Sequence, residues 1–234
     1  MFTIQYRDDV REKILNHAKT DKRIVSAAVI GSYSSGKVDK YSDIDLTFGV
    51  DESFSITSIL ESWTDYVTRE FMGIMLFDLQ SGNTTYRVFI LPGCLQVDLS
   101  FSPASQFGAI GPHFNLLWGN QNQIPLLNSL SSPQTTKEFF GYLMHHILRA
   151  RFCMERNELQ KSAYWINQAK IYAGKLGCTL DELNPVSNSC NKEEIIKAIQ
   201  TIILAITGSS EDVKVYAQKL KDILSELSSD HELV

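Results

Sequence analysis

The sequence has little of what marks a disulfide-rich, zinc-binding or membrane-spanning protein. Its 234 residues include 4 cysteines, and these show neither C-x-x-C spacing nor a pairing pattern; they are Cys94, Cys153, Cys178 and Cys190. No apolar run approaches membrane-spanning length, and the N-terminus predicts a charged amphipathic helix rather than a leader. We therefore expect a soluble, cytoplasmic protein with reduced cysteines and no membrane contact.

Basic residues are also scarce. The chain has 22 Lys and Arg against 27 Asp and Glu, with a formal net charge of -5 and a pI near 5.6. A bulk nucleic-acid substrate would require clustered Lys and Arg, which the sequence lacks, so nucleic acid is disfavoured as a partner. At 44% apolar composition a chain of this length can bury a real core, and we expect two small domains rather than one large one.

The first half of the chain alternates strand and helix patterns. Runs of β-branched residues and period-two alternation predict strands, and three- and four-residue apolar spacing behind a Ser cap predicts a helix at 55–71. The strands are expected at 24–31, 44–50, 73–80, 84–91 and 94–101, after a first helix at 6–19. Turn residues at 81–83 and 92–93 predict two hairpins. Residues 102–125, rich in Gly, Pro and aromatics, predict a connector packed on the surface.

From Pro133 onward strand patterns vanish and helical spacing takes over. About four helices are expected, at 135–156, 159–177, 192–207 and 210–227, with breaks at Gly177 and at 184–189. We therefore predict an α+β protein in which a mixed β-sheet domain with flanking helices (1–125) precedes a helical bundle (126–234).

The stretch from Gly31 to Val38, GSYSSGKV, is close to the phosphate loop G-x-x-x-x-G-K-[ST]. That loop needs a helix directly after it and a hydroxyl beside the Lys to hold magnesium. Val38 occupies the hydroxyl position, and the next strand follows too soon to leave room for the helix. We therefore disfavour a phosphate-loop ATPase.

A second interpretation starts from SDIDL. Side chains alternate along a strand, so Asp43, Asp45 and Thr47 share one face while the apolar residues between them face the core. Two carboxylates so close repel each other unless a cation lies between them, which indicates a magnesium site. The alternative is that both simply face water at a strand end.

Asp98 lies on a later strand, CLQVDLSF, again on the face opposite the apolar residues. If that strand lies beside the SDIDL strand, Asp98 completes a three-carboxylate cluster for one or two magnesium ions bridging a triphosphate. Gly31 lets the backbone approach a phosphate closely, and the Ser32 hydroxyl can donate to it.

The pattern G-S, ten residues, D-x-D, with a later acidic residue, resembles the signature of the DNA polymerase β-like nucleotidyltransferase superfamily. Its small-molecule branch, the aminoglycoside and lincosamide nucleotidyltransferases, often shows G-S-x-x-x-G, five residues, then S-D-I-D-L. The matching residues here are Gly31, Ser32, Gly36 and 42–46. Ser35 departs from the pattern, since many relatives carry Arg there, and one phosphate contact is thus missing.

The resemblance implies that a nucleoside triphosphate, ATP in the first place, donates its nucleotide to a hydroxyl of a small molecule, with an aminoglycoside-like antibiotic as one possibility. Asp43, Asp45 and Asp98 would be catalytic and would hold magnesium, as two ions, with Asp98 as a metal ligand or the general base. Gly31, Ser32, Ser42 and Lys170 would bind the nucleotide. The helical domain would help to form the acceptor cleft, and the chain would be a monomer or a homodimer.

Residues of the helical half carry weaker signals. Glu155 is a second candidate for the base, and Arg149 and Arg151, like Lys170, either reach the triphosphate or lie on a solvated helix face. His145 and His146 point about 100° apart as helix neighbours, so we expect polar packing rather than a shared metal. Four aromatic residues either stack on a ligand or belong to the core; they are Trp118, Tyr164, Trp165 and Tyr172.

A different class of function stays open beside the enzyme. The chain could be an antitoxin-like or regulatory protein of nucleotidyltransferase fold that acts on a protein partner. The complete acidic trio and the chain's own helical half both favour the enzyme.

Overall fold

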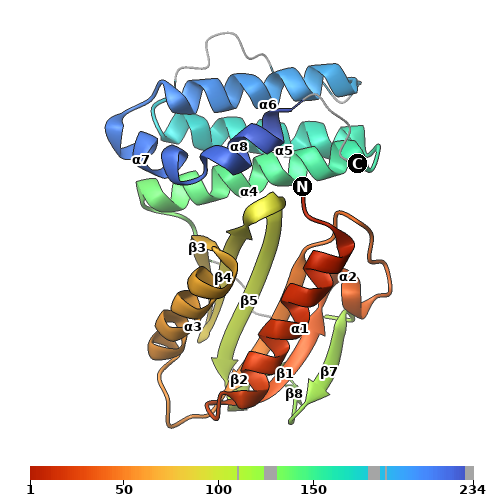
Figure 1. Cartoon of the computed structure of the whole chain (residues 1–234), viewed down its shortest axis with the longest axis vertical. Helices are drawn as coiled ribbons and strands as arrows, with labels where there is room; N and C mark the ends of the chain where they lie inside the picture. Colours follow the sequence, from red (N-terminus) through yellow and green to blue (C-terminus); the bar gives the residue numbers. More distant parts are fainter. Residues whose placement is uncertain (110, 124–130, 179–184, 188, 230–234) are drawn as a thin grey trace. The chain divides into compact units, whose positions relative to one another are not determined.

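The computed structural model describes residues 1–109, 111–123, 131–178, 185–187 and 189–229 (Figure 1). The chain divides into two compact units, one formed by Phe2–Ser132 and the other by Pro133–Val234 together with Met1. The predicted boundary between residues 125 and 126 lies outside the described residues.

A six-stranded mixed sheet forms the centre of the first unit, in the order β3-β4-β5-β2-β1-β7. The middle pair, β2 and β5, is parallel, and every other neighbouring pair is antiparallel. The strands are β1 (Ile24–Ile30), β2 (Ile44–Val50), β3 (Ile74–Ser81), β4 (Thr84–Leu91), β5 (Leu95–Pro103) and β7 (Phe114–Trp118). This sheet, with its helices and the helical second unit, confirms the predicted α+β class.

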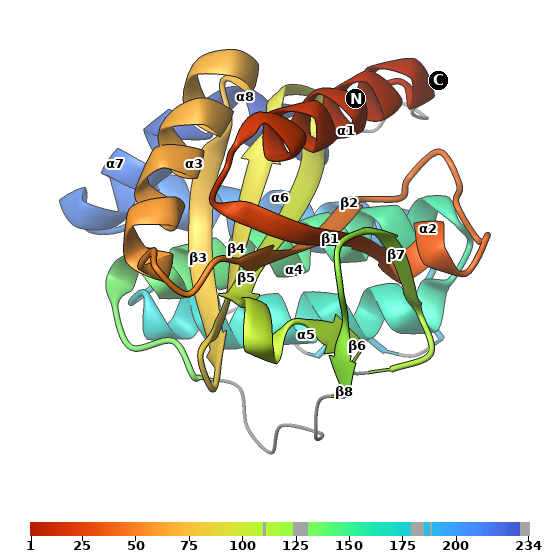
Figure 2. The same ribbon diagram turned by 90° about the horizontal axis from the view of Figure 1, so that it is seen from below.

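Helices α1 (Ile4–Thr20) and α3 (Ile56–Phe71) cover one face of the sheet, as Figure 2 shows. The apolar side chains of β2 and β5 alternate toward these helices, as period two requires. Trp63 of α3 is fully buried there, with its ring centroid 4.9 Å from that of Phe48 and 5.2 Å from that of Phe101. The predicted Ser cap is present, because Ser55 accepts a hydrogen bond from the Ser58 amide. On the opposite face, β2 and β5 carry polar side chains, among them Asp45, Thr47, Gln96, Asp98 and Ser100.

The prediction that residues 102–125 form a connector is wrong in one respect, because this stretch contains a strand of the main sheet. β7 pairs antiparallel with β1, with Ala28 opposite Leu116 and Ile30 opposite Phe114. Its Leu116 and Leu117 are both exposed, so the strand lacks the alternation that would have predicted it. Two short strands, β6 (Gly108–Ala109) and β8 (Asn122–Gln123), pair beside it.

In the second unit, the regular elements of the described residues are all helices. Its helices are α4 (Thr136–Glu155), α5 (Leu159–Lys175), α6 (Lys192–Thr207), α7 (Glu211–Lys219) and α8 (Lys221–Ser228). Reciprocal capping boxes, Thr135 with Glu138 and Asn191 with Glu194, fix the starts of α4 and α6. The single helix predicted at 210–227 is wrong, because the chain breaks at Leu220 (φ -107°, ψ 16°) into α7 and α8. Among the described helices, none combines the length and apolarity that crossing a lipid bilayer requires.

Candidate active site

Three carboxylates meet on the face of the sheet opposite α1 and α3. Asp43 directly precedes β2, Asp45 lies on it, and the parallel pairing sets Asp45 opposite Asp98 of β5. One oxygen from each carboxylate can be chosen so that all three lie within 4.8 Å of one another, and each residue is half-buried. The strand adjacency on which the three-carboxylate prediction depended is therefore present. Clustered carboxylate oxygens are the donor set that magnesium prefers.

A buried glutamine holds the third carboxylate in place. The side-chain amide of Gln96, two residues before Asp98 on the same face of β5, donates to both oxygens of Asp98, at 2.9 and 3.0 Å. Gln96 is 2% exposed. Its packing therefore fixes the orientation of the Asp98 carboxylate.

Gly31 directly follows β1, beside this cluster. Its φ is +67°, in the left-handed region that favours glycine. A β-carbon on residue 31 would also lie 2.1 Å from Oδ2 of Asp45 and 2.9 Å from its Cγ. A side chain at this position would therefore displace a carboxylate of the cluster.

Ser32 follows in a single helical turn, α2 (Gly31–Ser34). Its Oγ is buried and has no hydrogen-bond partner among the described residues. The neighbouring hydroxyls of Ser34 and Ser35 instead donate to the Gly31 carbonyl, at 2.9 and 3.3 Å. A buried hydroxyl without a partner is costly unless a ligand completes its hydrogen bonds. The phosphate contact of Ser32 stays a prediction.

Ser42, which the sequence predicted to bind the nucleotide, forms hydrogen bonds with Asp39 instead. Its side chain is buried, donates to the Asp39 carboxylate at 3.0 Å and accepts from the Asp39 amide at 2.9 Å. These bonds shape the loop that leads into Asp43. Its direct contact with a nucleotide stays a prediction.

Helix α1 anchors the segment that carries Gly31 and Ser32, which the sequence did not indicate. The Tyr33 hydroxyl donates to the carboxylate of Asp8, and the guanidinium of Arg11 lies 3.9 Å from the Tyr33 ring centroid. Arg7 of the same helix donates to the Asp39 carbonyl in the following loop. Both ends of the segment from Gly31 to Asp43 are thereby tied to α1. The only sequence signal was the position of Tyr33 inside the motif.

In this anchor the Asp8 carboxylate is stabilised by Tyr33 and by the positive charges of Arg7 and Arg11. Burial alone would raise the pKa of Asp8, but the Tyr33 hydrogen bond and the charges of Arg7 and Arg11 outweigh it and lower that pKa. Burial and the bond to Asp8 raise the pKa of Tyr33. Tyr33 therefore stays a hydrogen-bond donor and Asp8 a charged acceptor at neutral pH.

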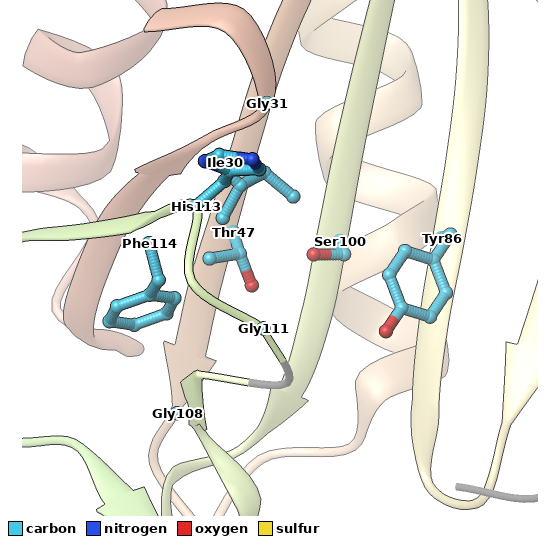
Figure 3. Close-up of a pocket in the computed structure, with 9 residues that line it drawn as sticks. All are labelled: Ile30, Gly31, Thr47, Tyr86, Ser100, Gly108, Gly111, His113 and Phe114. Carbon is cyan, nitrogen blue, oxygen red and sulfur yellow. The ribbon is translucent and has the colours of Figure 1, made fainter. Parts of the chain in front are cut away.

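A pocket of about 270 Å³ adjoins the carboxylates on the same face of the sheet. Gly31 lies at its border, and Thr47 and Ser100 face it one side-chain row beyond Asp45 and Asp98. Figure 3 shows Thr47, Ser100 and Tyr86 following one another across the strands, with Phe114 and His113 on the other side of Thr47. The full lining is Ile30, Gly31, Thr47, Tyr86, Ser100, Gly108, Gly111, His113 and Phe114.

The phosphate-loop alternative finds no support in this geometry. Lys37 is exposed, and the chain runs from it to β2 without forming a helix. The helix N-terminus that such a loop presents to phosphates is therefore missing.

Comparison with known proteins finds a family match for the first unit. Residues 12–92, about a third of the chain, match the family described as "Polymerase beta, Nucleotidyltransferase". The first unit contains a polymerase β-type nucleotidyltransferase domain. This match supports assignment to the nucleotidyltransferase class of enzymes. Within this domain the match includes Gly31, Ser32, Asp43 and Asp45, while Asp98 lies just beyond it.

Two further comparisons add little to the nucleotidyltransferase assignment. A solved structure described as an aminoglycoside 6-adenyltransferase from Bacillus subtilis is similar, at 14% identity and a TM-score of 0.33, over 97% of this chain and 99% of that chain. Identity and score are too low for this likeness to define a fold or an acceptor. A search of the curated proteins finds no significant match.

The residues predicted in the helical half belong to the second unit. Glu155 forms an ion pair with Arg151, at 2.9 Å, in which their side chains are 8% and 1% exposed. Arg151 also donates to the carbonyl of Ser229 at 2.6 Å, so both residues are engaged inside this unit. Lys170 of α5 is half-buried, and burial lowers its pKa. The nucleotide contact of Lys170 stays a prediction.

The two histidines belong to an aromatic cluster of α4 and α5. The His146 ring stacks on Trp165 with centroids 5.1 Å apart and lies 5.2 Å from the ring of Tyr172. Its Nδ1 is buried and has no hydrogen-bond partner among the described residues. Burial, with a smaller effect of Arg149, lowers the pKa of His146 to about 4. Among the described residues the acidic trio is the only cluster suited to a metal ion.

Proposed function

We propose that the chain is a magnesium-dependent nucleotidyltransferase that moves a nucleoside monophosphate, AMP from ATP in the first place, onto a hydroxyl of a small molecule. One observation carries the proposal: three carboxylates from adjacent strands converge beside a glycine that leaves them room and a buried serine hydroxyl without a partner. The donor set fits magnesium, since all three side chains offer hard oxygen ligands.

Asp43, Asp45 and Asp98 would hold the metal, which when bound neutralises charge on the triphosphate and its leaving group. The Ser32 hydroxyl donates to a phosphate oxygen, and Gly31 allows the phosphate to approach the backbone. Asp98 accepts the proton of the acceptor hydroxyl as general base. The acceptor oxygen forms a bond to the α-phosphorus while the bond from that phosphorus to the bridging oxygen breaks, and pyrophosphate leaves.

Asp98 is a better candidate for the base than Glu155. Asp98 lies within the acidic cluster, held by Gln96, whereas Glu155 is paired with Arg151 in the second unit. A base needs a carboxylate oxygen that is available for the proton, and the ion pair with Arg151 engages the carboxylate of Glu155.

The remaining parts of the proposal concern surroundings and partners. The acidic net charge of -5 favours a small-molecule acceptor over nucleic acid. The four free, buried thiols suit a reducing compartment, and we place the enzyme in the cytoplasm. Lys170 is proposed as a contact of the triphosphate.

The test is transfer of label from α-labelled ATP, with magnesium, to a mixture of aminoglycosides, lincosamides and small molecules from a cell extract. Asp43→Asn keeps the side-chain shape but removes a charged ligand, and we expect it to lower the rate at least about a hundredfold, because metal charge stabilisation contributes several kcal/mol. The matched control is Asp65→Asn, an exposed carboxylate on α3. Magnesium-dependent ATP binding without transfer to any acceptor would instead favour the regulatory alternative.

A further inference from the structure

The pocket beside the carboxylates carries an inference about the acceptor, which rests on the proposed function. It lies next to the acidic cluster, since Gly31 lines the pocket and approaches Asp45, and Thr47 and Ser100 are the next residues on the same face after Asp45 and Asp98. A group bound in it would lie directly beside the proposed base.

Three hydroxyls face this pocket without a hydrogen-bond partner in the part of the chain that the structure describes. No described residue forms a hydrogen bond with the side-chain oxygen of Thr47, Tyr86 or Ser100. The pairing register sets these residues side by side, with Ser100 opposite Thr47 on one neighbouring strand and opposite Tyr86 on the other. Burial raises the pKa of Tyr86, so its hydroxyl stays protonated and can donate. A row of unpaired donors and acceptors indicates a ligand with several hydroxyls of its own.

The rest of the lining is apolar or aromatic and carries no acidic group. Phe114, Tyr86 and His113 offer ring faces, and Ile30 offers an aliphatic one. Among the described residues that line the pocket there is no Asp or Glu, so a polycationic acceptor would find no counter-charge there beyond the metal-binding trio. Rings of this kind pack against the C–H faces of a sugar or cyclitol.

We infer that this pocket binds the acceptor, and that the acceptor is an uncharged, hydroxyl-rich ring compound such as a sugar, cyclitol or nucleoside rather than a polycationic aminoglycoside. Its volume of about 270 Å³ lies just below the range of roughly 300–1,000 Å³ usual for ligand pockets, which fits one or two rings. Asp98 takes the proton of the hydroxyl that enters from the Thr47 and Ser100 side.

The experiment offers the full chain α-labelled ATP and magnesium with two sets of probes. The neutral set is myo-inositol, trehalose and adenosine, and the cationic set is kanamycin and streptomycin. We expect label on a neutral probe. Thr47→Val and Tyr86→Phe should each raise KM for that probe roughly three- to tenfold, the usual result of losing one hydrogen bond, and leave KM for ATP unchanged. Tyr66→Phe, on the helix-covered side of the sheet, is the matched control.

Each other outcome has a distinct meaning. Transfer only to cationic probes, or to none while magnesium-dependent ATP binding persists, overturns the inference about the acceptor and leaves nucleotide binding standing. A rise of KM for ATP instead of KM for the acceptor in Thr47→Val and Tyr86→Phe also overturns it, because the pocket then holds the nucleobase. Loss of magnesium-dependent ATP binding in the unaltered chain overturns the proposed function itself. Ser100→Ala provides a third variant should either of the first two fail to fold.

Discussion

Gly31 meets two demands that no other residue satisfies together. The backbone is left-handed at φ +67°, and the space where a β-carbon would go is taken by the Asp45 carboxylate, 2.1 Å away. Gly36, five residues on, has nearly the same backbone at φ +66°, but a β-carbon added there would meet nothing within 4 Å. The two glycines therefore separate backbone strain from displacement of the site.

We predict that Gly31→Ala and Gly36→Ala each cost about 1–2 kcal/mol of unfolding free energy, because each places a β-carbon on left-handed backbone. Only Gly31→Ala should also abolish magnesium-dependent ATP binding, since it pushes Asp45 out of the cluster. Urea denaturation measures the first effect and titration calorimetry the second. Equal loss of ATP binding in both variants would contradict the assigned role of Gly31.

The acidic site was predictable at this scale because its residues have a sequence pattern. D-x-D on a strand and a lone carboxylate in CLQVDLSF break an apolar alternation, and such a break is visible without a structure. The pocket gave no such signal. Thr47, Tyr86, Ser100 and Phe114 come from four strands, and which of their side chains meet depends on strand order and register. The sequence also could not show that Gln96 turns toward Asp98.

At the scale of elements, α1 does more than cover the sheet. Arg7, Asp8 and Arg11 in its first turns contact Tyr33 and the Asp39 carbonyl, so the helix holds the segment that carries the proposed phosphate contact. Arg7, Asp8 and Arg11 also precede the stretch that matches the family, which begins at residue 12. The helix side of this anchor thus precedes the matched stretch, whereas Tyr33 and Asp39 lie within it.

We predict that Tyr33→Phe raises KM for ATP roughly three- to tenfold while kcat falls less, because losing one hydrogen bond frees the Ser32 turn without touching the carboxylates. Steady-state kinetics with varied ATP measures both constants. Tyr66→Phe removes a comparable surface hydroxyl, which donates to the Lys13 carbonyl at 3.2 Å, and should leave both constants unchanged. A fall in kcat with KM unaltered would argue against an anchoring role.

The missed elements share a physical cause. β7 is an edge strand without a buried face, so its pattern of apolar residues is no guide to its pairing with β1. The break between α7 and α8 falls at Leu220, which is neither Gly nor Pro, and apolar spacing continues through it. Both features depend on tertiary packing, whereas β2, β5 and α3 were predictable because they each bury one continuous face.

At the scale of the whole molecule, buried histidine makes the unfolding free energy depend on pH near neutrality. His146 has a folded-state pKa of about 4 against about 6.5 in an unfolded chain, because burial, reinforced by Arg149, disfavours its charged form. Burial also lowers the pKa of His145 well below its usual value, so its contribution has the same sign. The titratable neighbours Tyr142 and Tyr172 stay neutral in this range, since burial raises the pKa of each and that of Tyr142 reaches about 12.

The sign of the effect follows from proton uptake. As pH falls from 6.5 toward 4, His146 of the unfolded chain binds a proton that the folded chain does not bind. The contribution of His146 to the unfolding free energy is therefore fully present above pH 6.5 and is lost on acidification. The loss is at most about 1.4 kcal/mol per pH unit.

We predict that His146→Phe, which keeps a ring against Trp165 and removes the unpartnered Nδ1, flattens this dependence. Urea denaturation of both proteins at pH 7, 6 and 5, followed by far-ultraviolet circular dichroism, measures the two slopes. Equal slopes for His146→Phe and the unaltered chain would show that this buried ring does not control acid stability.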